Sequence, residues 1–316
     1  MFTILAITGP IYIVMAIGFV AGRARIFSGP DMRVLGTFVV KFALPALLFT
    51  ALSQRPIADI VNGRYLGAYA AGSLIVFLAA VAYSRFIRRN RMSFSVLIGL
   101  GMSFSNSGFV GYPIALQILG PPAAVALAMC MIVENVLMFP LALVLAEMDR
   151  DNVQRWDQIL LQSLAGLVRN PLILAIFAGF MVSLLGIQLS EPLVRTVNML
   201  AMASTALALF VIGGSLVGLK VRSVLGDVVE VAIGKLLLHP LAVFGMLWLL
   251  APVDEHLRMA ALIFASMPML SIYPILAQRY HHEGFCAAAL LVATLLSFLT
   301  VTGVLWVMTS LLGWAV

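Results

Sequence analysis

Charged residues are scarce in this chain of 316 residues. Only 10% are Asp, Glu, Lys or Arg, whereas a soluble globular domain carries about 25%. Hydrophobic residues make up 63% of the chain, and its mean hydropathy is +1.10. This composition excludes an ordinary soluble domain and predicts a polytopic membrane protein. The net charge of +6 is therefore interpreted through membrane topology, and no nucleic-acid partner is predicted.

Cysteine and catalytic motifs are also rare. Cys130 and Cys286 lie in apolar runs without a CxxC partner, so we expect both thiols to pack in the core. The chain lacks a Gly-rich phosphate loop, a G-x-S-x-G elbow and an H-E-x-x-H motif. We therefore predict no enzyme activity, no metal site, no organic cofactor and no direct coupling to ATP.

Long apolar runs dominate what remains. A membrane-spanning helix needs about 20 apolar residues, and ten segments qualify. The first lacks a preceding basic region, which predicts an uncleaved span rather than a signal peptide. The fold class is predicted to be an all-α polytopic membrane protein with ten transmembrane helices. The predicted spans are 2–21, 32–53, 64–87, 94–119, 122–146, 170–186, 192–219, 226–250, 256–280 and 284–313.

The basic residues predict an orientation. If the N-terminus is outside, 13 of the 19 Lys and Arg residues fall in inner segments and four in outer segments, with Lys41 and Lys235 inside spans. Because cytoplasmic segments are enriched in Lys and Arg, we predict that both termini lie outside. The 147–169 loop is then cytoplasmic, and its amphipathic part, 156–168, is expected along the membrane surface.

The two halves of the chain resemble each other. Pro10 and Gly18 recur as Pro171 and Gly179, at a common offset of 161 residues. Each half contains five predicted spans, an odd number, so the repeats must be inverted in the membrane. The predicted domains are a first repeat at 1–146, a connecting loop at 147–169 and a second repeat at 170–316.

A polar, helix-breaking stretch occurs in each half. The first, 99–122, contains three serines, Asn106, several glycines and Pro113 in an apolar setting, and 261–284 matches it at an offset of 162 residues. Glycine and proline weaken the helical hydrogen-bond ladder, and freed backbone groups in a bilayer need another partner. We predict that spans 4 and 9 are broken and cross at mid-membrane, as in secondary transporters.

Asn106 is the best single candidate for substrate contact. Its amide offers two donors and an acceptor, and half-helix N-termini beside it suit a carboxylate. The alternative is that Asn106 and the serines only join helices by hydrogen bonds.

Ionisable residues inside the predicted spans form a second candidate set, because buried charge in a bilayer is paired or functional. Glu134, followed by Asn135, either pairs with Lys235 or His239 or serves as a protonation site. Lys41 either extends to the interface or lines the pathway. A further polar cluster at 281–283 is expected to be a surface loop, since its spacing does not suit a metal.

Several segments together resemble the auxin efflux carrier family, in its short-loop bacterial branch with malonate-type carriers. They are 9–23, 42–49, 106–114, the Glu134-Asn135 pair, 169–173 and 235–240. The resemblance implies a scaffold of spans 1, 2, 6 and 7 and a moving transport domain of spans 3–5 and 8–10. Together with the interpretation of the single residues above, the resemblance predicts a substrate site. Its residues are Ser105, Asn106, Gly108, Gly111, Pro113, Pro268, Ser271, Tyr273 and Pro274.

The predicted function is secondary transport of a small organic anion, a carboxylate or a dicarboxylate such as malonate or malate. The transport domain would carry it across a bacterial cytoplasmic membrane by an elevator movement, with H⁺ or Na⁺ left open as coupling ion. The alternative is a sodium-coupled symporter of bile-acid type for an amphipathic anion. A homodimer through the scaffold is expected from the resemblance alone.

Overall fold

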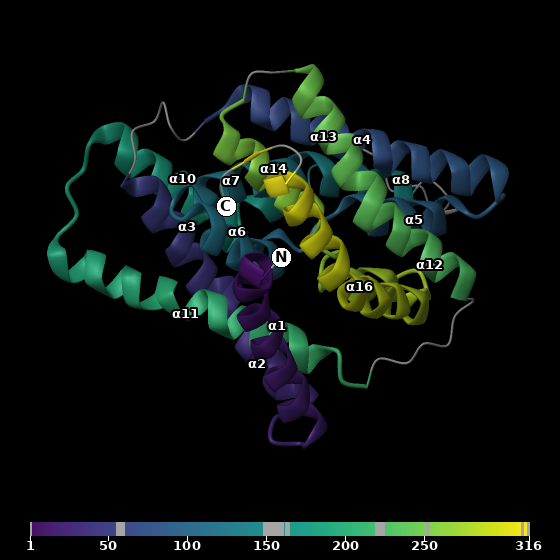
Figure 1. The fold of residues 1–316 in the computed structure, drawn as a ribbon, viewed down its shortest axis with the longest axis horizontal. Coiled ribbons are helices and arrows are strands. Elements are labelled where there is room, and N and C mark those ends of the chain that lie inside the picture. The colour runs from purple at the N-terminus through teal and green to yellow at the C-terminus, as the bar shows by residue number, and fades with distance from the viewer. Residues whose placement is uncertain are drawn as a thin grey trace.

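The computed structural model describes residues 2–54, 61–147, 161, 165–218, 225–250, 253–310 and 313–314. The secondary structure within these ranges is entirely helical (Figure 1). Seven helical stretches are long and apolar enough to cross a membrane, so the chain is a polytopic membrane protein. They are Gly29–Ser53, Gly63–Ile87, Met92–Leu119, Pro122–Glu147, Glu191–Ser215, Gly226–Leu249 and Glu283–Ser310.

A first helix group is built from both halves of the chain, with α1 packed along α11 and α3 packed on α10 and α11. Figure 1 shows α3, α10 and α11 together at the left of the molecule. The group consists of α1 (Phe2–Arg23), α2 (Gly29–Phe38), α3 (Leu44–Ser53), α10 (Pro171–Leu185) and α11 (Glu191–Ser215).

Glycines allow the backbones of this group to touch. A Cβ atom on Gly18 would lie 2.0 Å from the carbonyl oxygen of Phe210, and one on Gly213 would lie 1.8 Å from that of Met15. No side chain fits in either space, so glycine sets the close approach of α1 and α11.

The second helix group contains the remaining helices. In it, α4 packs between α5 and α13, α12 packs on α16, and α14 packs on α7. The members are α4 (Gly63–Ala82), α5 (Met92–Ser103), α6 (Tyr112–Leu119), α7 (Pro122–Ile132), α8 (Phe139–Glu147), α12 (Leu225–Ile233), α13 (His239–Leu249), α14 (Glu255–Ala265), α15 (Tyr273–Gln278) and α16 (Glu283–Ser310).

The stretch Met92–Leu119 lies at the centre of the molecule. Its most apolar window is 89% buried, against 33–56% for the other six candidate spans. Protein therefore surrounds this stretch, and its polar residues and freed backbone groups do not face lipid.

Both polar stretches leave the helical path. After α5 ends at Ser103, helix resumes at Ser107 in a π-helical turn that leads into α6. After α14 ends at Ala265, helix resumes at Tyr273. The first interruption thus lies well before Pro113, which sits inside the second half-helix.

A π-helical turn precedes four of the helical prolines, and each proline follows two residues after the turn ends. Proline lacks an N–H and clashes with the carbonyl of the preceding turn, and the wider π turn makes room for it. These prolines therefore bend helices without ending them. The turns are Val39–Ala43 before Pro45, Ser107–Gly111 before Pro113, Val133–Met138 before Pro140 and Gly234–Leu238 before Pro240.

Most of the predicted connecting loop, residues 148–160 and 162–164, lies outside the described residues. The predicted amphipathic part at 156–168 falls largely in the same ranges.

Candidate functional site

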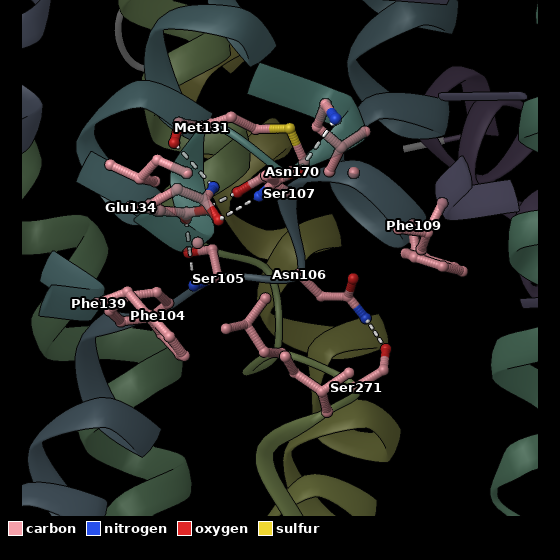
Figure 2. Close-up of a pocket in the computed structure, with 18 of the residues that line it drawn as sticks. Phe104, Ser105, Asn106, Ser107, Phe109, Met131, Glu134, Phe139, Asn170 and Ser271 are labelled. Atoms are coloured by element: carbon pink, nitrogen blue, oxygen red, sulfur yellow. Dashed lines mark hydrogen bonds between the residues drawn. The ribbon is translucent and has the colours of Figure 1, made fainter. Parts of the chain in front are cut away.

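The two interruptions meet beside a cavity of about 490 Å³. Both helix groups line it: Val40, Leu44 and Leu172 come from the first, and Asn106, Glu134 and Ser271 are among those from the second. Figure 2 shows Asn106 facing Ser271, with Ser105, Ser107 and Glu134 nearby. The cavity therefore lies between the two helix groups, and one of its walls is polar.

Asn106 joins the interruptions directly. Its backbone N–H donates to the carbonyl oxygen of Pro268 over 2.8 Å, and its side-chain Nδ2 donates to Ser271 Oγ over 2.7 Å. Asn106 is only 3% exposed. The two hydrogen bonds hold the interrupted segments against each other at one wall of the cavity.

The half-helix that follows Asn106 starts at this wall. Ser107, Gly108 and Phe109 are its first residues and all line the cavity. The first N–H groups of a helix have no partner within the helix, and the helix dipole favours negative charge there. The N-terminus of this half-helix therefore faces the cavity.

Glu134 is buried in the same wall, in the π-helical turn between α7 and α8. Its Oε1 atom accepts from Ser107 Oγ at 3.0 Å, Tyr69 OH at 3.3 Å and the Ser105 backbone N–H at 3.4 Å. Several neutral donors thus surround one carboxylate oxygen, an arrangement that stabilises a charge removed from water.

Lys235 is fully buried and has three acceptors. Its Nζ atom lies 2.8 Å from Ser105 Oγ, 2.8 Å from the carbonyl oxygen of Ala265 and 2.7 Å from His239 Nδ1. An ammonium has three donors, so a protonated Lys235 is fully satisfied. His239 then accepts at Nδ1 and donates from Nε2 to Ser73 Oγ at 2.9 Å.

Ser105 links these charges. Its hydroxyl accepts from Lys235, and its backbone N–H donates to Glu134. Among the described residues, no ion pair joins Glu134 to Lys235 or to His239. The structure thus differs from a direct pair, because the non-helical residue Ser105 occupies the space between the two side chains.

Several predicted site residues lie behind the cavity wall. A Cβ on Gly111 would lie 2.8 Å from the Phe264 ring, so this glycine permits contact with α14. The Tyr273 hydroxyl donates to the carbonyl of Leu97 over 2.7 Å. Pro113 and Pro274 lie in the first turns of α6 and α15.

The remaining predicted residues divide between the lining and the surface. Asn135 lines the cavity together with Ser105, Asn106, Gly108, Glu134 and Ser271. Lys41 is exposed on the π-helical turn before α3 and is not among the lining residues. This position fits the interpretation that Lys41 extends to the interface.

The polar cluster at 281–283 lies at the surface, as expected. His281 and Glu283 are exposed, and the ring of His282 lies 4.4 Å from that of Phe94. Burial lowers the pKa of His282. In the part of the chain that the structure describes, no group of three or more His, Cys, Asp or Glu residues could hold a metal ion.

Sequence reasoning missed three polar residues of the lining: Asn170, Glu147 and Arg279. Asn170 caps α10 through Oδ1 and donates from Nδ2 to Asn135 Oδ1 at 3.4 Å. The sequence feature that could have indicated Asn170 is the Asn170-Pro171 step, because proline is common at the first position of a helix. Glu147 and Arg279 are 3.2 Å apart in space but lie in different halves of the chain, so no local pattern joins them.

Comparison with known proteins shows the family of this chain. The family model described as "Membrane transport protein" matches residues 4–305. A protein of Rhizobium meliloti (strain 1021) named "Putative malonate transporter" is 28% identical over 302 residues, covering 95% of this chain and 94% of that protein. "Uncharacterized transporter YfdV" of Escherichia coli (strain K12) is 26% identical over 308 residues, covering 95% and 96%.

A plant protein is similar over a shorter region. "Auxin efflux carrier component 7" of Arabidopsis thaliana is 24% identical over 149 residues, covering 46% of this chain and 24% of that protein. Since the family model covers nearly the whole chain, the resemblance noted in the sequence is confirmed. This chain belongs to the membrane transport protein family, the family of the auxin efflux carriers, and is a multi-pass membrane transporter.

Proposed function

We propose that this protein is a secondary transporter of small organic anions, with a dicarboxylate such as malonate as the leading substrate. One observation carries the proposal. Two helix interruptions are joined by Asn106 at the wall of a cavity, and a half-helix begins there with its N-terminus at the lining.

The chemistry of this wall favours a carboxylate. The free N–H groups at Ser107–Phe109 donate to an anion, and the positive end of the helix dipole attracts it. Asn106 can exchange its bond to Ser271 for a bond to the ligand. A volume of about 490 Å³ accommodates a small metabolite.

An inverted repeat is supported by exchanged contacts in the first helix group. Gly18 of α1 approaches Phe210 of α11, and a Cβ atom on Gly179 of α10 would lie 3.0 Å from the carbonyl oxygen of Phe49 in α3. The glycines are 161 residues apart, and so are the phenylalanines. Each half thus contributes one partner to each contact, as a two-fold relation between the halves requires.

Transport follows from movement between the groups. We assign the first helix group, α1–α3 with α10 and α11, to the scaffold, and the second to the moving domain. Because the cavity lies between them, a displacement of the second group carries the Asn106 wall across the membrane. Both termini outside, a bacterial cytoplasmic membrane and a homodimer through the scaffold complete the proposal.

A buried amine favours sodium-independent transport over the bile-acid-type alternative. Lys235 Nζ binds the carbonyl of Ala265, the last residue of α14. A fixed ammonium there occupies the carbonyl end of the half-helix, which would otherwise suit Na⁺. Malonate uptake at equal rates in Na⁺ and K⁺ buffers is expected, and a strict Na⁺ requirement would favour the alternative.

Counterflow in proteoliposomes tests the function. Vesicles loaded with malonate should accumulate labelled malonate, and Asn106→Ala should raise the apparent Kd about 10- to 100-fold, because the partner groups lose a hydrogen bond in a water-poor site. Asn198→Ala, on α11 and outside the lining, is the matched control. If no carboxylate exchanges in the wild type, the proposal is wrong.

A further inference from the structure

An ion pair in the cavity lining joins the C-terminal ends of α8 and α15. Arg279 Nη2 is 3.2 Å from Glu147 Oε1, and both residues line the cavity. Arg279 follows the last residue of α15, and Glu147 is the last residue of α8. The side chain of Arg279 is 51% exposed and that of Glu147 only 7%, so the arginine faces the opening and the carboxylate lies behind it.

Arg279 is the single cationic side chain among the described lining residues. The wall at Asn106 offers neutral donors, while Glu134 places an acidic group nearby. An entering anion therefore meets a full positive charge only at the guanidinium of Arg279. In this conformation that guanidinium is paired with Glu147.

The pair is arranged so that Arg279 can leave it. The Tyr280 hydroxyl also donates to Glu147 Oε1, over 3.0 Å, so the buried carboxylate keeps a donor when the guanidinium turns away. Arg279 also borders a neighbouring cavity of about 210 Å³ between α5, α8 and α15, which gives the side chain room to change direction.

We propose that Arg279 is an anion-capture residue at the cavity mouth, where a substrate carboxylate replaces the carboxylate of Glu147 before the anion moves to the Asn106 wall. The inference rests on the proposed function and deepens it. A guanidinium binds a carboxylate through two parallel hydrogen bonds, and its attraction increases with the charge of the anion, so the site selects dicarboxylates over monocarboxylates.

The capture site is separate from the Asn106 wall. Arg279 comes eight residues after Ser271, most of them in α15, and eight helical residues span about 12 Å. Malonate is too short to bridge that distance. Arg279 thus acts in entry from its own side of the membrane, which the topology predicts to be the cytoplasm.

The test compares membrane vesicles of opposite orientation. In inside-out vesicles, Arg279→Gln should raise the KM for malonate about 5- to 10-fold, in keeping with a half-exposed charge-assisted contact, and should leave kcat unchanged. The KM for acetate should rise less. Right-side-out vesicles should show wild-type KM values, and Arg279→Lys should restore part of the affinity.

Two further variants separate capture from general effects of charge. Arg195→Gln removes an exposed arginine that pairs with Glu191 on α11 and should leave KM unchanged. Glu147→Gln removes the charge that competes with substrate and should lower KM. The wild-type KM should rise with ionic strength, and this dependence should weaken in Arg279→Gln.

The outcomes distinguish the two proposals. If the wild type transports malonate while Arg279→Gln keeps the wild-type KM and salt dependence, the capture role is overturned and the transport function stands. A KM in Glu147→Gln equal to or above that of the wild type overturns the exchange step. Failure of the wild type to bind or move any carboxylate overturns both.

Discussion

At the scale of single residues, the buried polar chain Glu134–Ser105–Lys235–His239 shows what a sequence can and cannot predict. Because isolated charge is costly in a bilayer, the sequence predicted that Glu134 either pairs with Lys235 or His239 or is a protonation site. The bridging role of Ser105 depends on where the backbone leaves the helix, and residue type alone does not reveal that.

Lys235 should be essential for stability. Lys235→Met leaves the carbonyl of Ala265 and the Ser105 hydroxyl without their donor and leaves Glu134 without a nearby positive charge, so we expect a loss of about 3 kcal/mol. Lys41→Met removes an exposed lysine and should change little. Thermal unfolding of both variants in one detergent at one scan rate measures the difference. Equal melting temperatures would contradict a stabilising role of Lys235.

His282 provides a pH-dependent contribution outside the spans. Burial lowers its pKa; among the smaller effects, Glu283 raises it and His281 lowers it. A base with a depressed folded-state pKa stabilises the fold above its ordinary value of 6.5 and loses that contribution as pH falls through the folded-state value. The melting temperature of the wild type should therefore decrease below pH 6.5 more steeply than that of His282→Phe.

At the scale of helices, glycine and proline have different effects on the fold. The repeat offset correctly located an interruption in each half, because both stretches combine small and polar residues in an apolar setting. The position of the first interruption was less predictable: Pro113 is accommodated by a π-helical turn, and the chain leaves the helix before Ser107. Tertiary packing against Pro268 and Ser271 decides the place.

The contact between α1 and α11 should be intolerant of a single methyl group. Gly213→Ala places a Cβ 1.8 Å from the Met15 carbonyl oxygen, so the helices must separate, at a cost of about 1–3 kcal/mol. Gly245→Ala on α13 meets no atom within 4 Å and should be neutral or stabilising. Unfolding in detergent measures the stability of the two variants. If Gly213→Ala is as stable as Gly245→Ala, the contact between α1 and α11 tolerates a methyl group and the prediction is wrong.

At the scale of the whole molecule, a cavity lies between the two helix groups, and the elevator proposal requires the groups to move relative to each other there. The Asn135–Asn170 hydrogen bond of 3.4 Å crosses this boundary, and in the elevator proposal it must break during each cycle. The sequence predicted ten spans, whereas seven helical stretches within the described residues meet simple length and hydropathy criteria, and the apolar stretches Gly9–Arg23 and Pro171–Leu185 are shorter.

Fixing this boundary should stop transport. In Asn135→Cys/Asn170→Cys protein, a mercury bridge should abolish malonate counterflow, and dithiothreitol should restore it. Native Cys130 and Cys286 are buried and should react slowly. The control pair Glu191→Cys/Arg195→Cys lies within α11 and should remain active when bridged. Full activity of the bridged Asn135/Asn170 pair would contradict relative movement at this boundary.

The central stretch Met92–Leu119 has a consequence for biogenesis. Its mean hydropathy of 1.2 is the lowest of the seven candidate spans, which otherwise range from 1.7 to 2.2. The insertion machinery reads each segment's apolarity as it emerges from the ribosome, so the segment that forms the site is the one least able to enter the bilayer alone. Its retention in the membrane then depends on packing against its neighbours, Gly63–Ile87 before it and Pro122–Glu147 after it.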